Sequence, residues 1–272
     1  MLLEVIESSC VAKTGISDDN EDVLVITPAF VAVIDGATDK SGRRIDGLTG
    51  GRFAALTIAQ ALRTLRPTVD LPECIAVLSE TLRAAVAAAY GDIEDHLPPS
   101  ASFIAYSAHH DQIWRVGDCR YRDGETVSAP ETKIEAIASA ARGTLLRMLI
   151  ESGADQDELA RDDPGRAMIL PLLKLAGYTQ NNEASEFGHG IIDGQPVPAR
   201  FCEAIAPKSG QIVLASDGYV AIAPTLAASE AALAELLAAD PLRMDARHPA
   251  TKGVRPGHLS FDDRTYVRLR RA

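Results

Sequence analysis

Acidic residues stand at the ends of short apolar runs that have the composition of β-strands. Five of them matter most: Glu21 and Asp22 before VLVI, Asp35 after FVAVI, Asp217 after QIVLAS, and Asp262 before TYVRL. Antiparallel pairing puts the start of one strand beside the end of its neighbour, so we expect these carboxylates to gather at common sheet edges. Hard divalent cations bind carboxylate oxygens, and two such ions can activate a water and neutralise a phosphoryl group under attack. The pattern predicts a metal-dependent phosphoester hydrolase in which Asp35 and Asp217 are the principal acids.

Each acid also has a simpler interpretation. An Asp-Gly pair after a strand is most often a turn, because glycine adopts positive φ and aspartate accepts a hydrogen bond from the nearby backbone. This applies to Asp35 with Gly36 and to Asp217 with Gly218. Glu21 and Asp22 belong to SDDNED, which is also typical of a solvated acidic loop. Only the joint pattern favours a metal site.

The helices and strands that must position these acids occur mostly in pairs along the sequence. Apolar periodicity predicts helices at 51–65, 75–89, 134–150 and 226–239, and strands at 23–26, 30–34, 101–108, 112–116, 119–122, 211–216 and 265–269. In this order strands occur as hairpins and helices occur in pairs. A doubly wound parallel sheet would instead alternate single strands and helices, so the order favours an antiparallel sandwich flanked by helices. The acidic stretch 153–165 is expected to be a loop that forms a lid or an insertion.

Composition restricts the functional class. The 272 residues are 46% hydrophobic and 24% charged, which is typical of a globular protein with its own core. A formal charge of −11 disfavours nucleic-acid binding, since phosphate backbones are held by Lys and Arg. The four cysteines have no zinc or redox spacing. No run of 18 apolar residues and no signal peptide are found, so we expect a cytoplasmic protein that does not bind a membrane.

Several segments, in order, resemble motifs of the PP2C-type metal-dependent protein phosphatases (the PPM family). They are NED at 20–22, VIDG at 33–36, VGDCR at 116–120, LASDG at 214–218 and DDRT at 262–265. The resemblance implies an α+β fold, a four-layer α-β-β-α sandwich with two central antiparallel sheets, and two Mn²⁺ or Mg²⁺ ions at one end of it. It further implies this ligand set: Asp35 bridging both ions, the Gly36 carbonyl with Glu21 or Asp22 beside metal waters, and Asp217 with Asp262 around the second ion. By the same resemblance, Asp118 is expected to shape a turn beside the site.

The sequence departs from the family pattern around the acids. Ser17 stands where family members commonly carry a phosphate-holding Arg, and Lys13 is the nearest basic residue. A lysine can hold phosphate as a point charge, although Lys13 could equally be a solvated surface residue. An insertion from Asp39 to Gly50 replaces the glycine turn and its His, and a third metal site is in doubt because residues 130–140 lack the expected Asp-His pair.

The predicted organisation is a single phosphatase domain over 1–272, with a variable insertion or flap at about 131–190. Four arginines in this segment, namely Arg142, Arg147, Arg161 and Arg166, could contact a phosphorylated substrate or form a solvated helix face. The resemblance implies hydrolysis of phosphoserine or phosphothreonine in proteins, with a small phosphorylated metabolite as an alternative substrate. A pseudophosphatase that acts as a regulatory binding module is the other alternative. Against the binding module, every metal-binding acid is retained, although clustered acids without metal repel one another.

Overall fold

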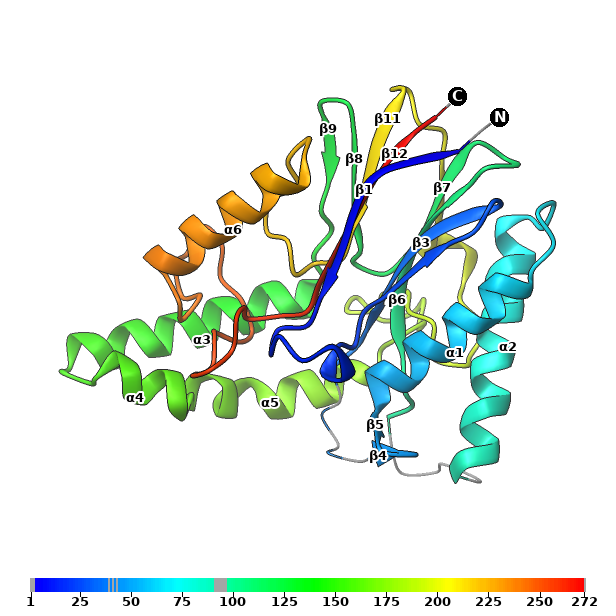
Figure 1. Ribbon diagram of the computed structural model, residues 1–272. Coiled ribbons are helices and arrows are strands. Elements are labelled where there is room, and N and C mark those ends of the chain that lie inside the picture. The colour runs from blue at the N-terminus through cyan, green and yellow to red at the C-terminus, as the bar shows by residue number, and fades with distance from the viewer. Residues whose placement is uncertain (1–2, 39, 41, 43, 91–96, 272) are drawn as a thin grey trace.

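Two antiparallel sheets form the centre of the protein. The computed structural model describes residues 3–38, 40, 42, 44–90 and 97–271. One sheet has the order β1-β12-β11-β8-β9 and the other the order β10-β7-β6-β3-β2, and the two lie face to face (Figure 1). The strands of the first are β1 (Glu4–Val11), β8 (Arg120–Asp123), β9 (Thr126–Ser128), β11 (Gln211–Ala215) and β12 (Arg264–Arg270). Those of the second are β2 (Val23–Ile26), β3 (Phe30–Gly36), β6 (Ala101–Ser107), β7 (Gln112–Val116) and β10 (Cys202–Ile205).

Apolar side chains pack in three layers, one between the two sheets and one between each sheet and its helices. This arrangement confirms the predicted sandwich. Between the sheets, Val33, Ile104, Leu214 and Val267 are fully buried in one cluster. Helices α1 (Gly50–Thr64) and α2 (Leu71–Tyr90) cover the outer face of the second sheet, and α6 (Leu226–Ala239) packs on the outer face of the first (Figure 1). Alternate residues of each central strand therefore face different layers, as the strand period of two requires.

Antiparallel pairing brings the acid-bearing strand ends together. In the β2–β3 hairpin Val23 lies opposite Ile34, so the residues just before β2 lie beside the end of β3. In the other sheet Ala215 of β11 lies opposite Tyr266 of β12. The acids after β11 and before β12 are therefore neighbours as well. Both pairs were predicted from the sequence.

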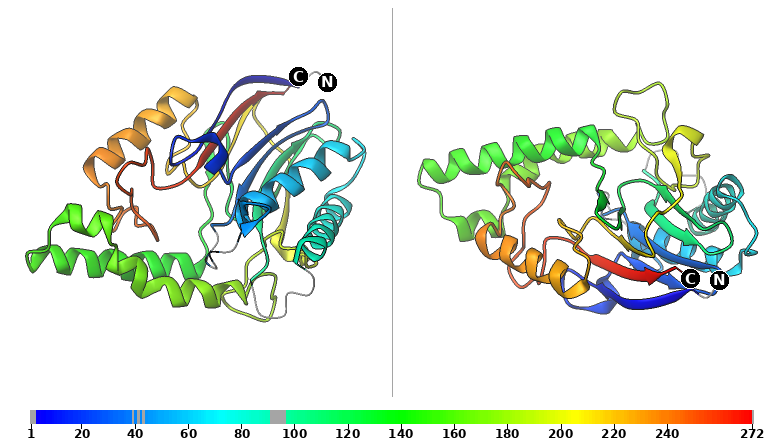
Figure 2. Two further views of the ribbon diagram at one scale, coloured as in Figure 1. Left: turned by 60° about the horizontal axis from the view of Figure 1, so that its bottom comes forward. Right: turned by 90° about the horizontal axis from the view of Figure 1, so that it is seen from above.

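Helices α3 (Lys133–Glu151), α4 (Gln156–Arg161) and α5 (Pro164–Gly177) form an arm across one end of the sandwich. α3 and α5 pack on each other, and the arm projects away from the sheets (Figure 2). The expectation of a loop over 153–165 was wrong. Asp155 accepts a hydrogen bond from the Glu158 N–H, and Asp163 accepts one from the Arg166 N–H with Pro164 at the first helical turn, so the acids of this stretch act as helix caps.

Three strands of the two central sheets, β1, β9 and β10, were not predicted, nor was the short hairpin of β4 (Arg44–Ile45) and β5 (Leu48–Thr49). β1 pairs with β12 and β10 with β7, each at the edge of its sheet. β1 alternates half-buried and exposed residues, a pattern that a single sequence shows only weakly. No helix in the described part of the chain is long and apolar enough to cross a lipid bilayer.

The start of α1 approaches the end of β3 very closely. The segment between them, the predicted insertion, carries the short hairpin β4 (Arg44–Ile45) and β5 (Leu48–Thr49), while its residues 39, 41 and 43 lie outside the described part. A Cβ added to Gly51 would lie 2.6 Å from the Ala37 carbonyl oxygen, and one added to Gly36 would lie 2.5 Å from the Gly51 oxygen. Gly51 therefore stands in the first turn of α1, where backbone atoms of the β3 end leave no room for a side chain.

Replacing Gly51 with alanine is expected to lower the free energy of unfolding by about 1–3 kcal/mol, because backbone atoms on both sides would have to move. Chemical denaturation measures the change. Gly210→Ala is the matched control, since nothing lies within 4 Å of a Cβ there. Equal stability of the two variants would contradict the close approach.

Candidate metal centre in an acidic cleft

A cleft of about 730 Å³ opens at the end of the sandwich beside the helical arm. Its walls include Asp35 and Gly36 from the end of β3, Asp217 from beyond β11 and Asp262 from before β12. The structure thus brings together four of the predicted ligand residues from both sheets. Glu21 and Asp22 are each only 4% exposed and lie buried next to the cleft, held by other side chains.

Asp35 lies among other acids. Burial raises the pKa of Asp35 well above its usual value, and the charges of Asp22 and Asp217 raise it further. Burial and Asp262 likewise raise the pKa of Asp217 to about 6, although Arg120 and Lys252 act in the opposite direction. Like charges so close together favour protonation unless a cation lies among them.

Asp22 connects the two sheets. Its Oδ2 accepts hydrogen bonds from Ser216 Oγ at 2.7 Å and Thr265 Oγ1 at 2.8 Å, both of which belong to the β11–β12 side. Despite these bonds, burial raises the pKa of Asp22 to about 8. Its contacts are those of a residue that fixes the sheets at the site.

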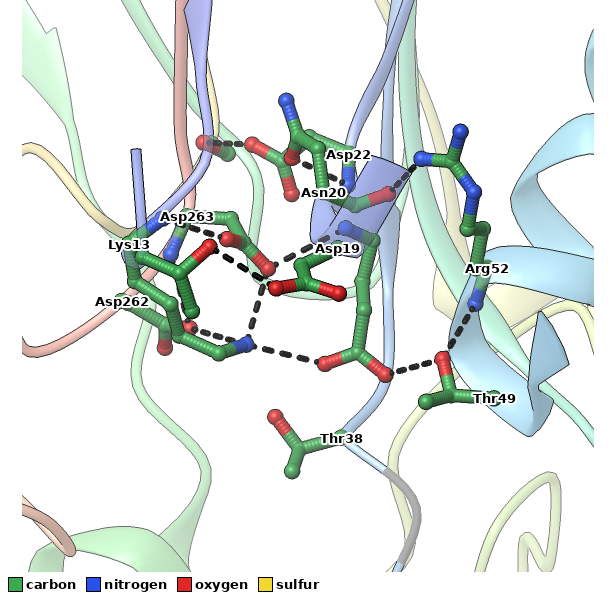
Figure 3. Close-up of polar contacts among 12 residues, drawn as sticks. Lys13, Asp19, Asn20, Asp22, Thr38, Thr49, Arg52, Asp262 and Asp263 are labelled. Atoms are coloured by element: carbon green, nitrogen blue, oxygen red, sulfur yellow. Dashed lines mark hydrogen bonds and ion pairs between the residues drawn. The ribbon is translucent and has the colours of Figure 1, made fainter. Parts of the chain in front are cut away.

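Lys13 lies among acids rather than on the surface. Its Nζ is 2.8 Å from Asp263 Oδ2 and 3.8 Å from Asp262 Oδ1 (Figure 3). It is also 3.0 Å from Glu21 Oε2. The side chain is 17% exposed, and although burial opposes it, the three carboxylates raise the pKa of Lys13. These contacts favour a charge-compensating role over the predicted phosphate-holding one.

Asp262 has a second lysine partner, which the sequence did not single out. Lys252 Nζ lies 2.7 Å from Asp262 Oδ2 and donates to Thr38 Oγ1 at 3.1 Å. Burial alone would raise the pKa of Asp262, but Lys252 and Lys13 outweigh it and lower the pKa. Glu21 is fixed in turn by Thr49 Oγ1, which donates to Oε1 at 2.6 Å.

Asp118 lines the cleft itself, whereas it was expected only to shape a turn beside it. Its Oδ1 accepts a hydrogen bond from Ser102 Oγ at 2.5 Å. The preceding Gly117 has φ +92°, and a Cβ there would lie 2.3 Å from Ser102 Oγ. Burial and Glu135 raise the pKa of Asp118, and the charge of Asp118 in turn raises the pKa of Asp35 and of Asp217, so it belongs to the same acidic cluster.

The donor set fits a hard divalent cation. Carboxylate oxygens of Asp35, Asp217 and Asp262, with the Gly36 carbonyl, are the ligand types that Mg²⁺ and Mn²⁺ prefer. The raised pKa of Asp35 is the effect that a cation would reverse. In the arrangement of the described residues, no three Asp, Glu, His or Cys side chains already enclose a single ion. For three of these side chains to hold one ion, their positions would therefore have to change.

The four arginines of the 131–190 segment have different environments. Arg142 is fully buried in an ion pair with Asp163, and Arg147 donates to the Met244 carbonyl. Arg161 is exposed on α4, and of the four only Arg166 lines the cleft. Their residue type is identical, so the sequence alone could not separate them.

The metal-free protein should lose stability as pH rises. The pKa of an aspartate is about 3.9 in an unfolded chain, whereas burial in the folded state raises the pKa of Asp22 to about 8 and that of Asp217 to about 6. Between these values the native state holds more protons than the unfolded state, so the free energy of unfolding falls with increasing pH. In EDTA, we expect a decrease of at least about 1.4 kcal/mol between pH 5 and pH 8, equivalent to one pKa unit. Denaturant titrations measure it, Asp22→Asn should flatten the slope, and a rising profile would contradict the assignment.

Comparison with known proteins gives a likeness in structure only. No protein-family model matches the sequence, and a search of curated proteins finds no match. The Mycobacterium tuberculosis serine/threonine phosphatase PstP/Ppp superposes with a TM-score of 0.51 at 16% identity, covering 99% of each chain. The catalytic domain of PstP with two manganese ions gives 0.50 at 16% identity over 99% of this chain and 98% of that one. Staphylococcus aureus Stp1 gives 0.50 at 13% identity over 99% and 95%. This chain therefore has the fold of the PP2C-type (PPM) serine/threonine phosphatases, at a sequence identity to these three structures of 13–16%.

Proposed function

We propose that the protein is a Mn²⁺- or Mg²⁺-dependent phosphomonoester hydrolase that acts on phosphoserine or phosphothreonine in proteins. The observation that carries the proposal is the convergence of Asp35, Asp118, Asp217 and Asp262, from both sheets, on one cleft. The fold, which is that of serine/threonine phosphatases, supports the same reaction class.

Some residues of the site would bind the cations, and others hold the cluster of acids in position. Asp35, the Gly36 carbonyl, Asp217 and Asp262 would hold the cations. Bound divalent cations supply an activated water and neutralise charge on the phosphoryl oxygens. Glu21 and Asp22 keep the cluster in place through the hydrogen bonds described above. Lys13 and Lys252 offset the charge of Asp262 before a cation binds.

Two other candidates are supported by particular observations. The cleft has the size of a small-molecule site and includes apolar walls from Leu97, Leu173 and Phe187, which would suit a small phosphorylated metabolite. The two lysines already paired with Asp262 would suit a binding module that has no need of metal.

Hydrolysis of para-nitrophenyl phosphate with Mn²⁺, with Mg²⁺ and with EDTA tests the proposal. We expect turnover that requires the cation and a calorimetric signal for Mn²⁺ binding. Absence of both turnover and metal binding would support the binding module. If turnover is found, kcat/KM for phosphoserine and phosphothreonine peptides should exceed that for small phosphate esters, and the reverse order would favour the metabolite phosphatase.

A further inference from the structure

One wall of the acidic cleft is cationic. Lys252 and Arg166 line it together with Asp35, Asp217 and Asp262, although they lie 86 positions apart in the sequence, on the segment before β12 and on α5. A backbone contact joins the two segments: Arg166 Nη1 donates to the carbonyl of Thr251, the neighbour of Lys252, at 3.1 Å. The segments that carry these two positive side chains are therefore held together at the cleft.

Arg166 keeps donors free for a ligand. Its backbone N–H is bonded to Asp163 and its Nη1 to Thr251, while Nε and Nη2 find no acceptor in the part of the chain that the structure describes. A guanidinium presents its N–H groups as a planar fork that matches two oxygens of one phosphate. The Arg166 guanidinium beside the acidic cluster is therefore suited to bind a phosphate when divalent cations are bound to the acids.

Lys252 also has a hydrogen-bond donor left for a ligand. Its ammonium group has three hydrogens, and two acceptors, Asp262 Oδ2 at 2.7 Å and Thr38 Oγ1 at 3.1 Å, account for two of them. Lys13 differs, because three carboxylates surround it and it does not line the cleft. Of the two lysines, Lys252 is the one placed to contact a ligand in the cleft.

A buried arginine holds both segments in position. Arg142 on α3 pairs with Asp163, the N-cap of the helix that carries Arg166, with Nη2 2.6 Å from Oδ2. Its Nη1 donates to the carbonyl of Ala250, two residues before Lys252, at 2.9 Å. Arg142 is therefore a positioning residue that connects the helix carrying Arg166 to the segment carrying Lys252.

We propose that Arg166 and Lys252 together bind the phosphate group of the substrate, the task for which no arginine is present at Ser17. This inference rests on the proposed hydrolase function for the identity of the substrate, but the binding of phosphate can be measured without turnover. The two cations come from the helical arm and from the segment before β12, so the anion-binding wall is built from parts of the chain outside the acid-bearing motifs.

Calorimetric titration of inorganic phosphate into the full chain, with and without Mn²⁺, tests the inference. We expect Arg166→Met and Lys252→Met each to raise the phosphate Kd at least tenfold and to raise KM for para-nitrophenyl phosphate more than they lower kcat. Arg166→Lys should recover only part of the affinity, since a lysine cannot donate two parallel bonds. Arg161→Met, an exposed arginine on the same arm, is the control and should bind phosphate as the wild type does.

The outcomes separate this inference from the proposed function. Turnover in Mn²⁺ with unchanged phosphate Kd and KM in both variants would overturn the phosphate site and leave the hydrolase intact. Phosphate binding that depends on Arg166 and Lys252 without any turnover would support the site and refute the hydrolase. A wild-type protein that binds no phosphate in either condition would also overturn the site. Denaturation midpoints close to that of the wild type show that the variants are folded.

Discussion

Asp35→Asn is expected to reduce kcat for para-nitrophenyl phosphate in Mn²⁺ by about 10³-fold or more. The change removes the carboxylate that interacts with Asp22, Asp118, Asp217 and Asp262 together, and a neutral amide cannot balance a divalent cation. A loss of this size corresponds to about 4 kcal/mol of transition-state stabilisation. Steady-state kinetics give the loss, and calorimetry should show weaker Mn²⁺ binding.

The same variant should remain folded, which distinguishes loss of chemistry from loss of structure. Removing a carboxylate whose pKa is raised by burial and by like charges relieves repulsion, so without metal the free energy of unfolding should stay equal or increase. Asp18→Asn makes the same chemical change at a side chain that is 98% exposed, and it should leave kcat unaltered. More than a tenth of wild-type activity in Asp35→Asn would refute the central role of this residue.

Arg142→Met is expected to lower the free energy of unfolding by about 3 kcal/mol. The substitution leaves Asp163 without its ion-pair partner and removes the donor that the carbonyls of Arg243 and Ala250 share. Loss of one member of a buried ion pair is strongly destabilising because the other charge stays uncompensated. Denaturant titration measures the change, and faster amide exchange in α5 should accompany it.

Arg147→Met is the comparison within the same helix. Arg147 also donates to a backbone carbonyl, that of Met244, but it has no ion-pair partner among the described residues. Its loss should therefore cost about 1 kcal/mol, the ordinary value for one hydrogen bond. If both substitutions had the same small effect, the special position of Arg142 between α5 and the segment before β12 would be disproved.

The central sheets could be predicted from the sequence because their local signals are strong. The β2–β3 hairpin and the β6–β7 pair are largely apolar runs separated by short turns, and the β2–β3 pairing sets which acids lie at its edge. Asp35 lies at an edge that this pairing sets, whereas Asp217 follows β11 of the other sheet and reaches the same cleft because the two sheets lie face to face. The ligand roles of these residues stay predictions, to be decided by metal binding.

The helical arm and the lysine contacts could not be predicted in the same way. Asp155 and Asp163 are typical of loops by residue type, and only their bonds to Glu158 and Arg166 identify them as caps. Lys252 has no motif around it, and it contacts Asp262 only because the chain turns back toward the cleft after α6. Contacts of this kind depend on tertiary structure, which a single sequence does not display.

The pairing of β1 with β12 has a consequence for how the protein is made. Lys13 and Asp263, which are hydrogen-bonded at 2.8 Å, are 250 residues apart in the chain. A ribosome must therefore have released residues 264–270 before β1 finds its partner and before Lys13 meets Asp263. Contacts with such long sequence separation form slowly. During synthesis the early acids, Glu21 and Asp22, would lack their later partners, so completion of the cleft should be among the last events of folding.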